Sequence, residues 1–142
     1  MKNWIEILNK ETTAFRYRAL DDFYILSPNF FFLDSNDGIA VRIDEDEEGR
    51  PIFCDCHTTL DYLEDVREVD VYDYADKLNK IVKRYRLDFN KTERTFSLKV
   101  PTDQPDYFVK YLGYFLQALS LLANIDVWYF ALIKRKRRAR LA

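Results

Sequence analysis

The sequence predicts an α+β protein with a five-stranded antiparallel sheet, a three-strand meander plus a hairpin, packed by helices in the order α-β-β-β-α-β-β-α. Three observations indicate this class. Aromatic and β-branched residues dominate residues 23–56, apolar residues recur at steps of three and four over residues 58–86, and residues 86–100 alternate around a polar centre. The first and third patterns are typical of strands joined by turns, and the second is typical of amphipathic helices.

The first half of the chain predicts a short helix and then the three-stranded meander. Trp4, Ile5, Leu8 and Phe15 fall at roughly helical spacing. The segments Ser-Pro-Asn, Asn-Asp-Gly and Glu-Glu-Gly-Arg-Pro then interrupt the apolar residues, as turns between strands do. We expect the three strands near residues 23–33, 39–44 and 51–56.

The second half predicts a helix pair, a hairpin and a final helix. A short and a longer helix are expected over residues 58–86, with the joint at Val69-Asp70-Val71. The hairpin strands are expected near 86–89 and 95–100, and the last helix near 106–124. Its polar residues form one narrow stripe, so we expect it to be packed on most of its circumference, with a partner subunit as one candidate for the second contact. The stripe consists of Asp106, Lys110, Gly113, Gln117, Ser120 and Asn124.

Length and charge predict one α+β domain over residues 1–133 and a basic tail over residues 134–142. The chain has 142 residues, of which 48% are hydrophobic, enough for a single core. The last nine residues hold six of the 22 basic groups and none of the 24 acids. Two cysteines at i and i+2 do not form a disulfide framework, and residues 1–10 contain no apolar run typical of a signal peptide. We therefore expect a cytoplasmic protein.

Four segments carry a resemblance to a known family: Ser27-Pro28-Asn29-Phe30, "DSNDGIAVRI", "DCHTTLDYLED" and "FLQALSLLANID". With these, residues 23–126 resemble the uncharacterised bacterial and phage proteins of domain-of-unknown-function family 1828. The resemblance implies a bacterial or phage origin, and the family brings no established activity. Where the family tends to have Asp-Asp-Gly, this chain has Asp55-Cys56-His57, which retains one acid and loses the glycine.

The stretch "FCDCH" holds both cysteines and the only histidine of the chain. Thiolates and an imidazole are zinc ligands, so Cys54, Cys56 and His57 are candidates for a metal site. A structural interpretation is favoured, because no second ligand cluster exists and free cysteine usually behaves as a small hydrophobic residue. In that interpretation both cysteines share a core-facing side of a strand, His57 makes the turn, and Thr58 caps the helix with Asp61 three residues later.

The helix pair carries a row of acids that is the candidate binding surface for a protein partner. Such a row is most often a solvated helix face, but it could also imitate a phosphate backbone or hold a divalent cation. Arg67 is the only base within the row, whose acids are Asp61, Glu64, Asp65, Glu68, Asp70, Asp73 and Asp76. We assign partner binding to Asp61, Glu64, Asp65 and Glu68.

The C-terminal region permits a membrane, a dimer or a nucleic-acid interpretation. Tyr111 to Ile133 contains one charge, Asp126, and a basic cluster follows it. A charge in mid-span is costly in a bilayer, so a soluble packed helix is favoured, with a break near Asn124 and Asp126 capping a short final helix. The aromatic residues Trp128 and Phe130 are the expected anchors of a homodimer. Lys134 to Arg140 could contact phosphates.

No enzyme motif is recognisable, and no cofactor is expected. A Gly-rich phosphate loop and a Gly-x-Ser-x-Gly turn are both missing from the sequence. The favoured function is therefore a small bacterial or phage-encoded interaction protein that binds another macromolecule. One alternative is a metal-dependent nuclease-like or other hydrolytic enzyme using Asp55 with Asp61 or Glu64. The other alternative is a nucleic-acid binder that uses the tail.

Overall fold

In the described part of the chain, six strands form an antiparallel sheet, which is one layer of the molecule. The computed structural model describes residues 4, 6–7, 15–19, 24–28 and 40–127, with side chains described at 4, 6, 7 and 40–127. The strand order is β1-β2-β3-β4-β6-β5, with every neighbouring pair antiparallel. The strands are β1 (Phe15–Ala19), β2 (Tyr24–Pro28), β3 (Val41–Glu45), β4 (Pro51–Cys54), β5 (Asp88–Asn90) and β6 (Thr95–Lys99).

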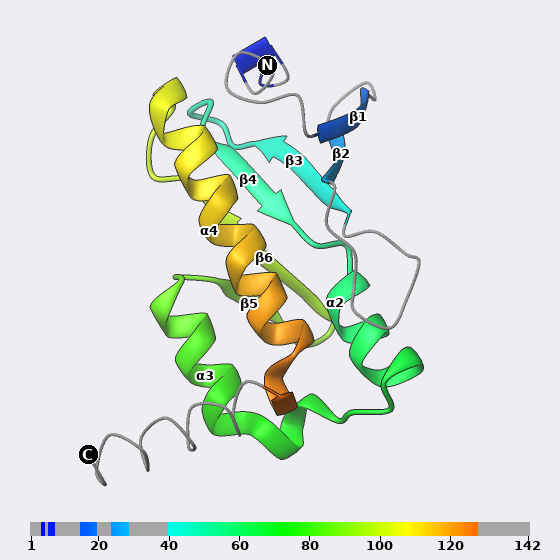
Figure 1. Cartoon of the computed structure of the whole chain (residues 1–142). Helices are drawn as coiled ribbons and strands as arrows, with labels where there is room; N and C mark the ends of the chain where they lie inside the picture. Colours follow the sequence, from blue (N-terminus) through cyan, green and yellow to red (C-terminus); the bar gives the residue numbers. More distant parts are fainter. Residues whose placement is uncertain (1–3, 5, 8–14, 20–23, 29–39, 128–142) are drawn as a thin grey trace, which may run out of the picture.

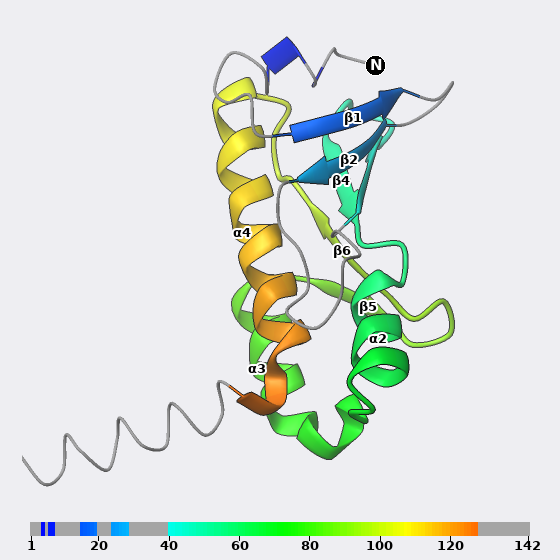
Figure 2. The same cartoon turned by 45° about the vertical axis from the view of Figure 1, so that its right-hand side comes forward.

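The helices form the second layer, on one face of the sheet (Figure 1). Helix α2 (Thr58–Asp61) continues directly into a π-helical turn, η1 (Tyr62–Val66). After a joint, a 3-10 turn, η2 (Val71–Tyr74), leads into α3 (Ala75–Arg84). Helix α4 (Pro105–Ala123) crosses the sheet, with α3 beside its C-terminal half (Figures 1 and 2).

The α+β class with an antiparallel sheet packed by helices is confirmed, but the number of strands is wrong by one. The additional strand, β1, pairs with β2 and includes Phe15, which the helical spacing assigned to the N-terminal helix. Its sequence, FRYRA, alternates apolar and charged residues, and this period of two favours a strand. Trp4 is helical as expected, whereas Ile5 and Leu8 lie outside the described residues. The first expected strand, near residues 23–33, corresponds to β2, which ends at Pro28, and residues 29–39 of the expected meander lie outside the described part.

The expected helix pair, hairpin and final helix are present. The pair is interrupted at residues 67–70, close to the expected joint, and β5 and β6 form the hairpin. The break near Asn124 is also confirmed, because Asn124 is the C-cap of α4. Asp126 does not act as the expected cap: its carboxylate binds Arg67 through two contacts of 2.7 Å. Arg67 also donates to the carbonyl of Ala123, so the joint is fixed to the end of α4.

The core lies between α4 and the helix-facing side of the sheet, and it is rich in aromatic rings. Phe108 of α4 is stacked on Trp4 with centroids 4.7 Å apart, and Phe53 of β4 lies 5.5 Å from Phe108. Phe115, two turns further along α4, lies 5.8 Å from Phe53. All four side chains are fully buried. Trp4 therefore completes the core at the start of α4.

The narrow polar stripe of α4 is confirmed, since its members are exposed except for the half-buried Asn124. The remaining sides of α4 contact β4, α2 and α3, so neighbours within the same chain account for much of its packing. The proposed dimer anchors Trp128 and Phe130 lie outside the described residues, and dimerisation stays a prediction. No helix in the described part of the chain is both long and apolar enough to cross a bilayer.

Replacing Phe108 tests the aromatic core. We expect Phe108→Ala to lower the free energy of unfolding by about 3–5 kcal/mol, because it removes a fully buried ring and leaves a cavity. The neighbouring Tyr107, which is 45% exposed, provides the control, and Tyr107→Ala should change stability by less than about 0.5 kcal/mol. Urea unfolding monitored by tryptophan fluorescence measures both. Equal losses in the two variants would contradict the assigned core.

Candidate functional site

The junction of β4 and α2 contains most of the residues that the sequence singled out. Along β4, Pro51 and Phe53 face the core, while Ile52 and Cys54 are only half-buried. Because side chains alternate between the faces of a strand, Asp55 follows on the buried side, where it is fully inaccessible to solvent. Cys54 therefore lies on the other side of the sheet. The expectation that the cysteines are core residues is wrong, because the strand alternation places the acid inside instead.

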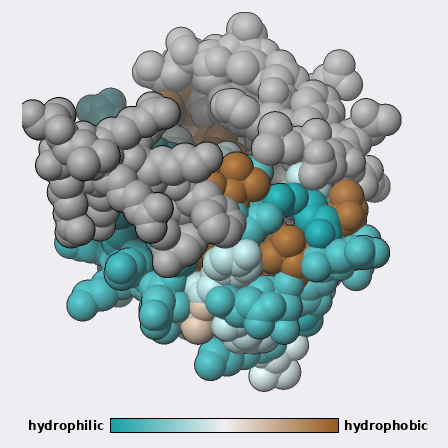
Figure 3. All heavy atoms as spheres, turned by 60° about the horizontal axis from the view of Figure 1, so that its bottom comes forward, coloured by the Kyte–Doolittle hydropathy of each residue, from teal (hydrophilic) through white to brown (hydrophobic). Residues whose placement is uncertain are grey.

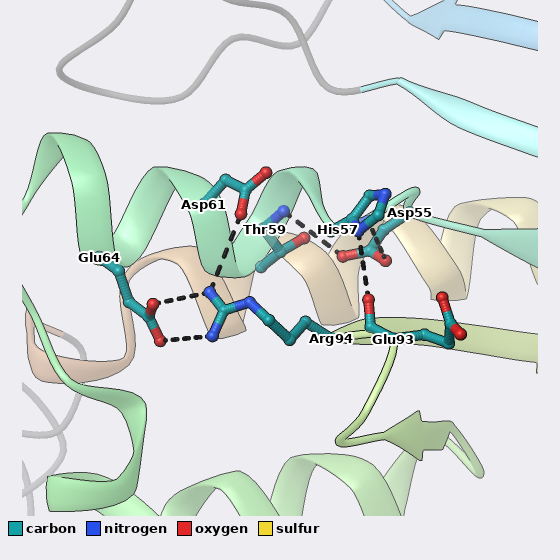
Figure 4. A network of polar contacts seen from close by, with 7 residues as sticks. All are labelled: Asp55, His57, Thr59, Asp61, Glu64, Glu93 and Arg94. Carbon is teal, nitrogen blue, oxygen red and sulfur yellow. Dashed lines mark hydrogen bonds and ion pairs between the residues drawn. The ribbon is translucent and has the colours of Figure 1, made fainter.

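Asp55 organises the start of α2 with its carboxylate (Figure 4). Its oxygens accept hydrogen bonds from the backbone N–H groups of Phe96 at 2.9 Å, His57 at 3.3 Å and Thr59 at 3.4 Å. The hydroxyl of Thr58 donates to the Asp55 carbonyl, so Thr58 does not cap the helix with its side chain as expected. His57 makes the turn as expected, with φ of 59°. Burial raises the pKa of the Asp55 carboxyl, against the opposing effect of these donors.

The two cysteines form a local thiol pair. The Cys56 backbone N–H lies 3.5 Å from the Cys54 sulfur, and the Cys56 thiol lies 3.9 Å from the Cys54 carbonyl. A hydrogen bond from the Cys56 thiol lowers the pKa of Cys54 to about 6, and the same bond raises the pKa of Cys56. Arg42, the cross-strand neighbour of Cys54, further favours the thiolate. Cys54 is therefore the more nucleophilic of the two thiols at neutral pH.

The structure does not gather the proposed metal ligands. The His57 ring nitrogen Nδ1 lies 3.2 Å from the carbonyl of Glu93, in the turn between β5 and β6 (Figure 4). Among the described residues, no three His, Cys, Asp or Glu side chains converge as metal ligands would. His57 instead connects the start of α2 to the hairpin.

The carboxylates of the hydrolase alternative do not converge either. Glu64 binds Arg94 through contacts of 2.6 and 3.1 Å, and Asp61 lies 3.8 Å from the same guanidinium (Figure 4). Asp55 is buried and engaged by backbone donors. Arg94 was not anticipated from the sequence, because it lies 30 residues from Glu64 and reaches it only through the folded hairpin. The geometry therefore gives the hydrolase alternative no support.

Four of the five remaining acids of the row form an exposed acidic surface around η1 and η2, defined here by Asp65, Glu68, Asp70 and Asp73. The fifth, Asp76, is exposed at the start of α3. All four are exposed, and none forms an ion pair within the described part of the chain. Arg67, the only base of this segment, is bound to Asp126 and does not offset their charge. Figure 3, which views the molecule from this end, shows a few apolar areas among the mainly hydrophilic residues of its coloured part.

Two apolar side chains are exposed within the acidic surface. Val66 is 44% and Tyr72 is 47% exposed, although Val66 continues the apolar stripe of the sequence. The surface is bounded on the α3 side by a hollow of about 400 Å³, which Lys77 and Lys80 line together with Tyr72 and Asp73. Asp76 also lines this hollow, so its lining carries charges of both signs.

The buried carboxyl of Asp55 predicts an unusual pH dependence of stability. Because its pKa is raised above the ordinary 3.8, the folded state holds this proton more tightly than the unfolded state does. The associated stabilisation is complete below pH 3.8 and is lost as the pH rises through the folded-state pKa. Asp55→Asn, which cannot titrate, should lack this dependence. Urea midpoints of both proteins across this range measure it. The midpoint of the wild type relative to that of Asp55→Asn should fall as the pH rises, and a wild-type midpoint that rises relative to the variant would contradict the prediction.

A second substitution at Asp55 separates the hydrogen bonds from the charge. Asp55→Ala leaves the buried N–H groups of Phe96 and Thr59 and the part-buried N–H of His57 without an acceptor, so we expect it to lower stability by about 3 kcal/mol or more. Asp55→Asn keeps an oxygen that can serve Phe96 and His57, and it should lose less. If both variants lost equal stability, the hydrogen bonds would not be the source of the effect.

The thiol pair predicts selective alkylation of Cys54. The rate of its reaction with iodoacetamide should rise with a midpoint at about pH 6, because the thiolate is the reacting species. Mass spectrometry of peptides locates the modified residue, and Cys56→Ala should move the midpoint upward, because it removes the thiol that donates to Cys54. A midpoint near that of an ordinary cysteine, about 8.5, would contradict the assignment.

Comparisons of this chain with known proteins find no match. No protein-family model matches the chain. No curated protein and no solved structure matches it either.

Proposed function

We propose that this protein is a small interaction protein that binds a positively charged segment of another protein through its acidic surface. The observation that carries the proposal is the exposure of four carboxylates without ion pairs, among the described residues, around two exposed apolar side chains. Charge guides such association and apolar contact supplies affinity. A partner segment that combines lysine or arginine with apolar residues has the matching chemistry.

The partner-binding residues are adjusted from those assigned by sequence alone. Asp65 and Glu68 are kept, because both are exposed. Glu64 is bound to Arg94, and Asp61 lies near the same arginine, so a partner would compete with a cation already present. Asp70 and Asp73 take their place. Tyr72 supplies an amphipathic side chain of the kind that often dominates interface energies.

A cytoplasmic setting, a bacterial or phage origin and the resemblance to family 1828 remain part of the proposal. So does a homodimer through Trp128 and Phe130, which lie outside the described residues. Binding of nucleic acid by Lys134 to Arg140, also outside them, is the alternative. No observation in the described part favours an enzyme over a binding protein.

Charge reversal tests the acidic surface. We expect Asp65→Lys/Glu68→Lys to weaken binding of a short lysine-leucine peptide by about tenfold or more, since close charge pairs across an interface strongly affect affinity. Isothermal titration calorimetry measures the affinity. The control Glu47→Lys/Asp88→Lys makes the same change in net charge at exposed acids outside the surface, and it should change binding by less than about threefold.

The result also separates the alternatives. Equal weakening in both double variants would show that only net charge matters and would overturn the assigned surface. Binding of duplex DNA with a steep salt dependence, lost on deleting residues 134–142 and kept in Asp65→Lys/Glu68→Lys, would favour the tail.

A further inference from the structure

A hollow of about 370 Å³ lies between the end of α3 and the middle of α4, away from the acidic surface. Its volume is within the range typical of small-molecule sites. Among the described residues, arginine, tyrosine and glutamine side chains line it, and no carboxylate does. The lining residues are Arg84, Tyr85, Arg86, Tyr111, Tyr114 and Gln117.

The two arginines of the hollow differ from the other arginines whose side chains the structure describes. Each of those others binds a carboxylate, as in the pairs Arg42 with Asp44, Arg50 with Asp46, Arg67 with Asp126 and Arg94 with Glu64. Arg84 and Arg86 form no ion pair within the described residues. Two guanidinium groups of an acidic protein are therefore available to an anion from solution, and arginine is well suited to bind phosphate.

The backbone conformation at Arg86 shows that the ending of α3 does not explain an arginine at this position. Leu87 N–H donates to the Val82 carbonyl and Arg86 N–H to the Lys83 carbonyl, which is the Schellman ending of α3. In this motif Arg86 occupies the left-handed position, with φ of 55°, where glycine is the least strained residue. Arg84, in the last turn, is also favoured by the helix dipole, but Arg86 lies beyond the helix and has a conformational cost instead.

The α4 wall of the hollow is aromatic. Tyr111 and Tyr114 meet edge to face at 5.8 Å, and Tyr114 is 42% exposed. Lys110 lies 5.9 Å from the Tyr114 ring and adds positive charge beside the wall. Exposed tyrosine rings stack on nucleobases. Gln117 offers both a donor and an acceptor to a polar base edge.

We propose that this hollow binds a nucleoside phosphate, with the phosphate held by Arg84 and Arg86 and the base against the tyrosine wall near Gln117. The ligand is a free nucleotide or a nucleotide of a single strand, since both present the same groups. The proposal is independent of the acidic surface, which has the opposite charge and lies around η1 and η2.

Calorimetry on the 142-residue chain tests the ligand class. The probes are the four ribonucleoside 5′-monophosphates, the corresponding nucleosides, inorganic phosphate, phenyl phosphate and a short single-stranded oligonucleotide. We expect at least one monophosphate or the oligonucleotide to bind about tenfold more tightly than its nucleoside and than inorganic phosphate. Binding by the oligonucleotide alone identifies the single strand as the source. No binding at about 1 mM ligand, or phenyl phosphate binding as tightly, overturns the proposal.

Arg86→Gly locates the site without threatening the fold. Glycine suits the left-handed backbone, so the melting temperature should be unchanged or higher. Affinity for the bound probe should fall about tenfold, because a charge-assisted contact to phosphate is removed. The control Lys91→Ala removes one exposed cation from the β5–β6 turn and should change affinity less than about twofold. Equal effects in both variants, or full affinity in Arg86→Gly, would place binding elsewhere, for example on residues 134–140, and overturn the proposal.

Discussion

The buried carboxylate of Asp55 is the constraint on which the arrangement of the middle of the chain depends. It accepts hydrogen bonds from the N–H groups of His57 and Thr59, at the start of α2, and from Phe96 in β6. A single side chain therefore fixes where β4 ends, how α2 begins and how the hairpin lies against both. Burying a carboxyl group is unfavourable unless donors surround it, and here the backbone supplies them.

The position of Asp55 also decides what its neighbours can do. Because Asp55 faces inward, the thiol of Cys54 lies on the side of the sheet that the helices do not cover, next to Arg42. His57 reaches the carbonyl of Glu93 and connects α2 to the hairpin. The neighbouring Arg94 then binds Glu64. Residues that resemble a metal or catalytic cluster in the sequence are thus used mainly to join three elements.

Opposite charges are separated onto different parts of the helical layer. The acidic surface around η1 and η2 remains uncompensated because Arg67 is bound to Asp126. The hollow beside α3 remains cationic because none of the described residues that line it is an acid. Both regions contain a charged residue with positive φ, Glu68 in the first and Arg86 in the second. Such conformations cost about 1–3 kcal/mol. Glycine would avoid this cost, so a charged residue at such a position is easier to explain if its side chain has a role.

Sequence alone determined the class of the fold, the helix pair, the hairpin and the polar stripe of α4, because these follow from local periodicity. The sequence also contained the alternation that makes FRYRA a strand and the alternation of residues 51–55 that places Asp55 inside. Helical spacing instead assigned Phe15 to a helix, and the usual behaviour of free cysteine assigned the cysteines to the core. The tertiary structure alone decided which charges remain exposed. Arg94 meets Glu64 across 30 residues and Arg67 meets Asp126 across 59, whereas Arg84 and Arg86 meet no described acid. Ion pairs depend on distances in space, and a linear pattern of charges does not specify those distances.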